Sequence, residues 1–195
     1  MIAQVVAMVL NTQASLFVLT ALVRFWMQVC RAPSRNPIAQ FSMALTDWAV
    51  KPLRRVIPGL FKLDWSSLIV AWALEYLLLF LLQALKAGDI PENAALYMAL
   101  LFMSFVELLR LSVYVFICAI FIQVALSWVN PRHPVGPFFD AFANPLLKPV
   151  RRFVPPIGGV DISPVFVLLL LQILLILPIA WLEGEAGAMM QRALL

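Results

Sequence analysis

The sequence predicts an all-α polytopic membrane protein whose four transmembrane helices form two parallel repeats, each a span, a basic loop and a second span. Of the 195 residues, 64% are hydrophobic and 12% are charged, whereas a soluble domain is nearer half apolar and a quarter charged. The apolar residues lie in long blocks, which is typical of membrane spans rather than of a large soluble core. A basic motif that precedes an apolar block also occurs twice, 97 residues apart.

The first repeat is expected over residues 1–90. Its first span, about residues 5–27, is long enough to cross a hydrocarbon core of about 30 Å, because each helical residue rises about 1.5 Å. The loop that follows has an apolar stripe at helical spacing over residues 38–50, which predicts a short amphipathic helix lying at the membrane interface and ending at Pro52. The second span is expected at about residues 66–85.

The second repeat, residues 91–195, begins with an apolar block that is too long for one span. Residues 94–129 would form a helix of about 54 Å, far more than a bilayer core requires. A separate span in the first half would also place the two basic loops on opposite sides of the membrane. We therefore expect one span at about residues 111–129, preceded by an extra apolar helix at about 94–110 that is interfacial, protrudes or packs against the bundle.

The rest of the second repeat contains a proline-rich loop and a final span. Eight prolines from Pro131 to Pro164 disfavour a long helix in this loop, and its phenylalanines are expected to dip into the membrane as a short interfacial or re-entrant helix. Ser163 and Pro164 suit the N-cap and the first turn of a helix, so the last span is expected at about residues 163–182. Pro178 is expected to kink this span.

The repeated motif reads K-P-x-R-R-x-x-P, from Lys51 to Pro58 and again from Lys148 to Pro155. Ten of the fourteen Lys and Arg residues lie in the two loops that contain it. Because loops rich in Lys and Arg tend to stay on the cytoplasmic side of a membrane, both loops are predicted to be cytoplasmic and both termini outside. The cations expected to contact lipid or a partner are Lys51, Arg54, Arg55, Lys148, Arg151 and Arg152.

Three kinds of ligand are considered for these cations. Anionic lipid headgroups would attract each charge by ~1 kcal/mol near the membrane surface and would anchor the topology. A membrane-protein partner or a second copy of the chain would dock on the same charges. Nucleic acid is the least favoured ligand, and none is expected, because no aromatic side chains are interleaved with the basic residues.

An Asp-x-Ser tripeptide follows each motif at the same distance and stands directly before a span, from Asp64 to Ser66 and from Asp161 to Ser163. Short polar side chains suit helix starts, where they accept hydrogen bonds from free backbone amides, and the carboxylates also suit ion pairs with the nearby arginines. A proton carrier or a metal ligand is the alternative role for the two aspartates. No zinc site is predicted, because the chain has one histidine and no cysteine cluster.

Among the polar residues in the apolar blocks, four are candidate site residues. Glu75 is in the middle of the second span, where a charged carboxylate is costly, and Gln172 is at the equivalent position of the last span. This equivalence predicts a shared polar position between helices, used for hydrogen bonding or for handling an ion or a proton. Glu107 and Arg110 are three residues apart on one helical face and are expected to pair.

Three segments of the second repeat form a distinctive pattern: Ser127-Trp128-Val129-Asn130-Pro131, Lys148-Pro149-Val150-Arg151-Arg152 and Gly158-Gly159-Val160-Asp161-Ile162-Ser163-Pro164. This pattern resembles the signature of the YggT family of small bacterial membrane proteins, which has relatives in chloroplasts, and the resemblance covers most of the chain. The first repeat departs from the pattern at Cys30–Pro33, Trp48 and Phe61–Lys62. We therefore expect the second loop to retain any shared role better than the first.

The resemblance implies an integral inner-membrane protein. Family members are associated with osmotic or ion homeostasis, with division and nucleoid organisation, and in plastids with cytochrome assembly. The resemblance to the family assigns no catalytic residue to this chain. The sequence also shows no nucleophile–base pair and no cofactor motif. We expect a non-enzymatic protein without a cofactor, structural or adaptor-like, that organises membrane proteins or lipids or acts in osmotic-stress homeostasis. The alternative is a component of an ion channel or transporter that uses the intramembrane polar residues.

Overall fold

The structure, a computed structural model, describes residues 2–57, 63–87, 93–154 and 161–194. Every regular element in these residues is a helix, and four stretches are long and apolar enough to cross a membrane: Gln4–Val29, Trp65–Lys86, Ala94–Val129 and Ser163–Leu194. This finding confirms the all-α class and the four expected spans. The elements in order are α1 (Ile2–Val29), α2 (Pro37–Val56), α3 (Trp65–Ala87), α4 (Ala94–Val129), α5 (Gly136–Arg151), α6 (Ser163–Leu174), the π-helical turn η1 (Leu175–Ile179) and α7 (Ala180–Leu194).

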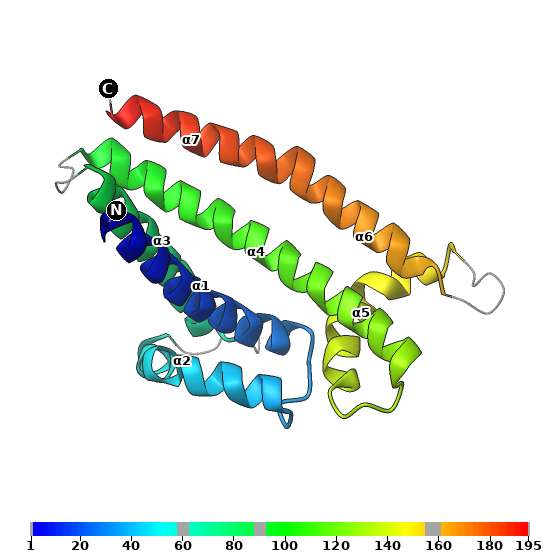
Figure 1. Cartoon of the computed structure of the whole chain (residues 1–195). Helices are drawn as coiled ribbons and strands as arrows, with labels where there is room; N and C mark the ends of the chain where they lie inside the picture. Colours follow the sequence, from blue (N-terminus) through cyan, green and yellow to red (C-terminus); the bar gives the residue numbers. More distant parts are fainter. Residues whose placement is uncertain (1, 58–62, 88–92, 155–160, 195) are drawn as a thin grey trace.

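The long helices form two antiparallel hairpins that lie side by side (Figure 1). In the first repeat α1 packs along α3, in the second α4 packs along α6 and α7, and a contact between α3 and α4 joins the repeats. Both chain termini lie at one end of the bundle, and the short helices α2 and α5 lie away from them. The two repeats therefore run parallel to each other, with their basic loops at the same end.

The largest apolar core lies near the basic-loop end and is built from side chains of α1, α2, α3, α4 and α5. Leu22 of α1, Val50 of α2 and Phe142 of α5 are at most 1% exposed. The ring centroid of Phe142 is 6.0 Å from that of Phe116 on α4. Elsewhere the outer faces of the long helices expose large apolar side chains such as Leu169, as expected for helices that are surrounded by lipid.

The expected boundary between an extra helix at 94–110 and a span at 111–129 is wrong, because both belong to one continuous helix, α4. No proline or glycine interrupts α4, and its first half has a packing partner of its own. Leu96 and Leu100 form a buried cluster with Ala193 near the end of α7. Of the three placements considered for the first half, the structure shows packing against the bundle.

The last helix is longer than the expected span at 163–182. It continues through η1 and α7 to Leu194, so residues 183–194, which lie beyond the expected span, are also helical. The disturbance expected at Pro178 takes the form of the π-helical turn η1, whose wider geometry accommodates a residue without an amide donor. Packing explains the extra length, because α7 lies on α4 and buries Ala186 and Ala193.

The short helix of the first repeat extends further than its expected end at Pro52. α2 begins at Pro37, where the side chain of Asn36 accepts a hydrogen bond from the Ala39 amide (2.9 Å). It then continues through Pro52 to Val56. Packing of its buried side against α1 and α3 stabilises the helix enough to offset the amide donor that the proline lacks.

The proline-rich loop of the second repeat, which we expected to lack a long helix, contains the 16 residues of α5, including Pro145 and Pro149. Its phenylalanines pack against the protein itself. Phe138, Phe139 and Phe142 are at most 9% exposed and form an aromatic cluster that packs against α4. Tertiary burial again outweighs the local preference against helix.

Candidate functional site

The two copies of the basic motif make the same ion pair. In the first repeat Arg54 binds Asp64, and in the second repeat Nε of Arg151 lies 2.7 Å from Oδ2 of Asp161. We call these two contacts the hinge ion pairs, because each joins the C-terminal part of a short helix to the start of the next membrane helix. They confirm the expectation that the aspartates partner the nearby arginines.

In the first repeat the hinge ion pair belongs to a buried network. The side chain of Asp64 is 3% exposed and accepts hydrogen bonds from the Ser67 hydroxyl (2.7 Å) and from Nε2 of Gln28 (3.4 Å). Nε of Arg24, whose side chain is 6% exposed, lies 3.7 Å from Oδ2 of Asp64. One carboxylate thus ties together α1, α2 and α3.

Arg24 extends this network along α2. Its Nη1 donates to Oγ1 of Thr46 (2.9 Å) and to Oδ1 of Asp47 (2.8 Å), and Asp47 also pairs with Lys51 at 2.7 Å. Arg24 was not predicted as a site residue, because it lies inside a span and 22 or 23 residues from these partners. The available signal was a lone cation near the end of an apolar span, which by itself suggests snorkelling to the interface.

The electrostatics of the network keep Asp64 ionised. Burial alone would raise the pKa of this carboxyl group, but hydrogen bonds from Arg54 and Ser67 and the charges of Arg54 and Arg24 hold the pKa below its usual value. An ionised carboxylate with these partners suits a structural ion pair. It does not suit the alternative role of a proton carrier near neutral pH.

The second repeat has a smaller and more exposed network. The side chains of Arg151 and Asp161 are each 38% exposed, and Oδ1 of Asp161 accepts a hydrogen bond from the Ser163 amide (2.9 Å). Burial alone would raise the pKa of Asp161, but hydrogen bonds from Ser163 and Arg151 hold it below its usual value. Phe121 stands at the position equivalent to Arg24. The more extensive network is therefore in the first repeat, although its motif departs further from the family pattern.

The serines of the two tripeptides do not cap the membrane helices as expected. α3 begins one residue before Ser66, whose hydroxyl donates to the Ile57 carbonyl (3.0 Å). In the second repeat Ser163 is the first helical residue, and its hydroxyl is buried without a hydrogen-bond partner among the described residues. The aspartates, not the serines, make the side-chain bonds at both helix starts.

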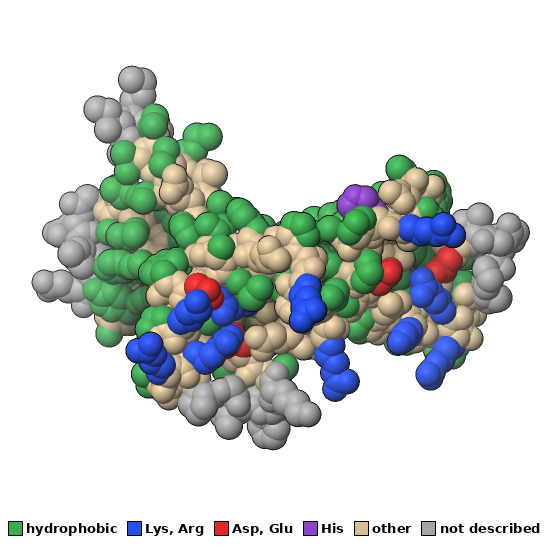
Figure 2. All heavy atoms as spheres, turned by 90° about the horizontal axis from the view of Figure 1, so that it is seen from below, with side chains coloured by type: hydrophobic (Ala, Val, Ile, Leu, Met, Phe, Trp, Pro, Cys, Tyr) green, Lys and Arg blue, Asp and Glu red, His purple; other side chains and the backbone are tan. Residues whose placement is uncertain are grey.

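The cations of the loops, ion-paired and unpaired, form an exposed basic face over α2, α5 and the segments at their ends (Figure 2). Three of the six motif cations are held in the ion pairs described above. Arg55, Lys148 and Arg152 are exposed and have no ion pair within the described residues. We use the term basic face for the exposed Lys and Arg residues of the two loops and their short helices, which are Arg31, Arg35, Lys51, Arg54, Arg55, Arg132, Lys148, Arg151 and Arg152.

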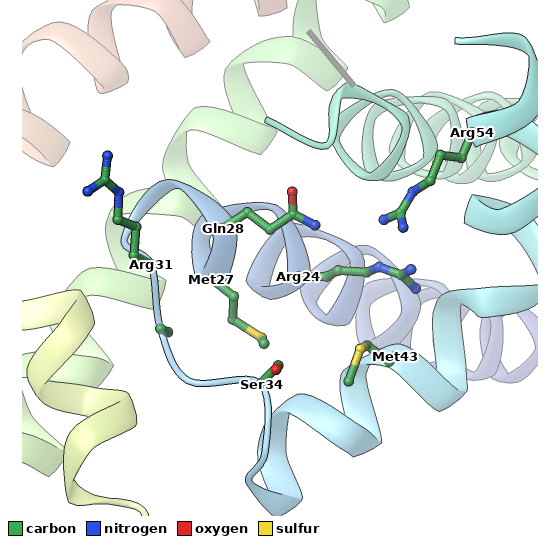
Figure 3. Close-up of a pocket in the computed structure, with 8 residues that line it drawn as sticks. Arg24, Met27, Gln28, Arg31, Ser34, Met43 and Arg54 are labelled. Atoms are coloured by element: carbon green, nitrogen blue, oxygen red, sulfur yellow. The ribbon is translucent and has the colours of Figure 1, made fainter. Parts of the chain in front are cut away.

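A cavity of ≈ 250 Å³ lies beside the buried network, between the end of α1, the segment after it and α2. Figure 3 shows the guanidinium groups of Arg24 and Arg54 directed toward each other, with Gln28 beside them, whereas Arg31 points away. The cavity is lined by Arg24, Met27, Gln28, Arg31, Ala32, Ser34, Met43 and Arg54. It is a cationic cavity at the end of a membrane-spanning helix.

A second polar cluster lies within the spans and joins the two repeats. Arg110 of α4 pairs with Glu107 (2.9 Å), as expected, and also with Glu183 of α7 (3.1 Å), which lies just beyond the expected last span. Glu75 of α3 is 6% exposed, and Glu107 and Arg110 are its charged neighbours. Gln172 is exposed on α6, so the predicted polar position shared with Glu75 is wrong. No group of His, Cys, Asp and Glu in the described ranges is suited to hold a metal ion.

Comparisons with known proteins find the same family in both repeats. The CCB3/YggT family model matches residues 3–85 and 102–182. A Pseudomonas aeruginosa protein is 35% identical over 181 residues, which are 92% of this chain and 90% of that relative. The YggT protein of Escherichia coli K12 is 31% identical over 166 residues, which are 85% of this chain and 84% of that relative.

A further relative matches a shorter part of the chain. The ycf19 protein of Guillardia theta is 37% identical over 76 residues, which are 37% of this chain but 79% of that relative. No solved structure is a significant match. Because the family model covers most of both repeats, the chain belongs to the CCB3/YggT family.

Proposed function

We propose that this chain is a non-enzymatic scaffold of the bacterial inner membrane, which gathers anionic lipids and a membrane-protein partner, or a second copy of itself, at its basic face. In this proposal the basic face is cytoplasmic and both termini are outside. The positive-inside tendency of membrane proteins supports the orientation. The link to osmotic-stress homeostasis rests on what the family resemblance implies.

The observation that carries the proposal is that the two hinge ion pairs place equivalent free cations on one face. Arg54 and Arg151 are used to hold α2 and α5. The next residue in each motif, Arg55 or Arg152, is exposed and without an acidic partner in the described residues. Each such cation would attract an anionic headgroup by about 1 kcal/mol near the membrane surface. In this proposal the two motif copies offer two matched basic sites to the same membrane surface.

The test is the double variant Arg55→Ala with Arg152→Ala. We expect it to co-purify with less anionic phospholipid, and with less of any protein partner, because its free cations are removed while the hinge ion pairs remain. Lipids bound to the detergent-extracted protein are quantified by mass spectrometry, and bound proteins by quantitative proteomics.

The matched control is Lys86→Ala with Arg192→Ala, which removes two exposed cations from the opposite end of the chain's bundle. This control is expected to keep the lipid and protein profile of the wild type. The proposal is contradicted by a basic-face variant whose lipid and protein profile equals that of the wild type.

A second candidate function, the handling of an ion or a proton, is favoured by the polar cluster within the spans. Glu75 is almost fully buried near the middle of α3, beside the ion-paired residues of α4. A charged carboxylate inside a membrane span costs free energy, and such residues usually belong to functional sites in membrane proteins. This candidate does not need the basic face.

Ion flux across liposomes separates this candidate from the scaffold. If the cluster handles ions, wild-type protein produces a proton or cation flux that Glu75→Gln reduces, whereas Glu185→Gln at an exposed position of α7 does not. Liposomes with wild-type protein that show no flux above empty liposomes would exclude the candidate.

A further inference from the structure

The cavity beside Arg24 is a feature of the first repeat, whereas the hinge ion pair is common to both repeats. Seven of its eight lining residues have a different residue type at the equivalent position of the second repeat, and Arg54 is the exception. Arg24 and Gln28, for example, correspond to Phe121 and Ala125. The fold of a repeat therefore forms without this polar lining, which points to a separate role for the cavity.

We propose that the cavity binds a phosphate group, supplied either by the headgroup of an anionic phospholipid or by free phosphate. This inference rests on the proposed scaffold function and deepens it, because it names one specific site for the lipid. Three arginines line the cavity, and the ion pairs around them add Lys51, Asp47 and Asp64. Four positive and two negative charges leave a net charge of +2, which favours an anion.

The donors of this site are held in position before any ligand binds. Arg24 has a side chain that is 6% exposed, its Nη1 is bound to Thr46 and Asp47, and its Nε faces Asp64. A guanidinium group has five N–H donors, and the Nη2 donors of Arg24 have no protein acceptor among the described residues. Fixed guanidinium groups match the oxygens of phosphate in geometry and charge.

The neutral lining also suits a phospholipid. Gln28 and Ser34 add polar side chains, and Figure 3 shows the Ser34 hydroxyl directed toward the space between α1 and α2. Met27, Ala32 and Met43 add apolar surface, which fits the glycerol group and the first methylene groups of a lipid. The position at the end of α1 is where the headgroups of a surrounding bilayer would lie.

Arg31 at the edge of the cavity has a backbone conformation that favours glycine, with a φ of 54°. The Ala32 amide donates to the Met27 carbonyl (2.8 Å) and the Arg31 amide to the Gln28 carbonyl (3.2 Å). These are the two bonds of a Schellman C-cap, whose left-handed residue is usually glycine. An arginine at this position indicates a use for its side chain, whose charge attracts anions to the cavity from the edge.

Binding is measured on the full chain in a non-ionic detergent by native mass spectrometry. The probes are short-chain phosphatidylglycerol, the matching diacylglycerol without phosphate, and inorganic phosphate. Saturable binding of phosphatidylglycerol but not of diacylglycerol supports the site with a lipid as the source. Binding of inorganic phosphate alone supports the site with solution phosphate as the source. No saturable binding of either phosphate compound overturns the proposal.

Two variants place the binding in the cavity. Ser34→Phe fills the cavity and keeps every charge, so we expect at least about tenfold weaker binding, the effect of losing one or two charge-assisted hydrogen bonds. Ser127→Phe, the same change at an exposed serine of α4, is the control and is expected to bind as the wild type. Arg31→Gly is expected to weaken binding several-fold, and misfolding does not explain such a loss because glycine fits the left-handed conformation.

The outcomes also separate this proposal from the scaffold function. Wild-type affinity in Ser34→Phe overturns the cavity site, even if the double variant of Arg55 and Arg152 loses anionic lipid. A loss in Ser34→Phe with no effect of that double variant contradicts the scaffold function of the basic face and keeps the phosphate site.

Discussion

At the residue scale, the first repeat depends on the charge of Asp64. This carboxylate is 3% exposed, whereas Asp161 at the equivalent position of the second repeat is 38% exposed. Removing one partner of a buried ion pair leaves the other charge without compensation, which is far more costly than the loss of an exposed pair. The two repeats therefore provide a matched comparison of the same substitution.

We predict that Asp64→Asn lowers the free energy of unfolding by about 3 kcal/mol, because Arg24 and Arg54 lose their shared anion. Asp161→Asn is predicted to lower it by less than about 1 kcal/mol. Thermal unfolding of both variants in detergent measures the difference. Equal losses in the two variants would show that the buried network is not what stabilises the first repeat.

The stability of the protein is also predicted to depend on pH through Asp64. Its folded-state pKa is lowered, because the hydrogen bonds from Arg54 and Ser67 and the nearby positive charges outweigh the effect of burial. The resulting stabilisation is complete above the unfolded-state pKa of about 3.9 and is lost as the pH falls through the folded-state value. Wild-type melting temperatures should therefore fall below about pH 4, and the fall should be shallower in Asp64→Asn.

A substitution at Arg31 is predicted to stabilise the folded protein, in contrast to the substitutions at Asp64 and Asp161. Left-handed backbone costs a residue with a Cβ roughly 1 kcal/mol, and glycine avoids this cost at a C-cap. Arg31→Gly is expected to raise the free energy of unfolding by up to about 1 kcal/mol, and Arg31→Ala is not. A lower melting temperature for the glycine variant would contradict the left-handed conformation of Arg31.

Residue patterns predicted part of the site. The equal spacing of the motif in the two repeats identified the aspartates and arginines of the hinge ion pairs as candidate site residues. The three-residue spacing of Glu107 and Arg110 predicted their contact. Arg24 and Glu183 were missed because their partners lie on other helices, and no local pattern encodes such a contact. The equivalence of Glu75 and Gln172 led to a wrong prediction, because residues at equivalent positions of two repeats are not necessarily buried to the same extent.

At the element scale, prolines interrupt the helices less than their positions in the sequence predict. α2 continues through Pro52, α5 contains Pro145 and Pro149, and Pro178 is absorbed by a single π-helical turn. Each proline removes one amide donor, but packing of the buried helix face stabilises the whole element. Helix ends in this chain were therefore set by tertiary contacts that single-sequence patterns do not contain.

Docking of α5 leads to a prediction of its own. Phe142 is 1% exposed and packs against Phe138 and Phe116, whereas Phe153 is 85% exposed. Phe142→Ala should lower the free energy of unfolding by about 3 kcal/mol or more through loss of buried surface and a cavity, and Phe153→Ala should change it little. Equal melting temperatures for the two variants would favour an α5 that lies in the membrane rather than on the protein.

At the scale of the whole molecule, the two repeats share a topology and differ in specialisation. Composition and the 97-residue repeat were sufficient to predict four spans and a parallel arrangement, because both depend on long apolar blocks rather than on particular contacts. The same hinge ion pair occurs in each repeat, and the cationic cavity lies in the first. The repeats thus diverge at the cavity and agree at the hinge ion pair.

The central claim is that both motif copies face the same side of the membrane, and cysteine labelling of intact cells tests it most directly. In a chain whose Cys30 and Cys118 are replaced by Ala, single cysteines are introduced by Ser34→Cys, Arg132→Cys and Lys86→Cys. Ser34→Cys and Arg132→Cys are predicted to be protected from an impermeant thiol reagent, and Lys86→Cys to be labelled by it. Labelling of Ser34→Cys and Arg132→Cys from opposite sides, or of all three from one side, would contradict the parallel repeats.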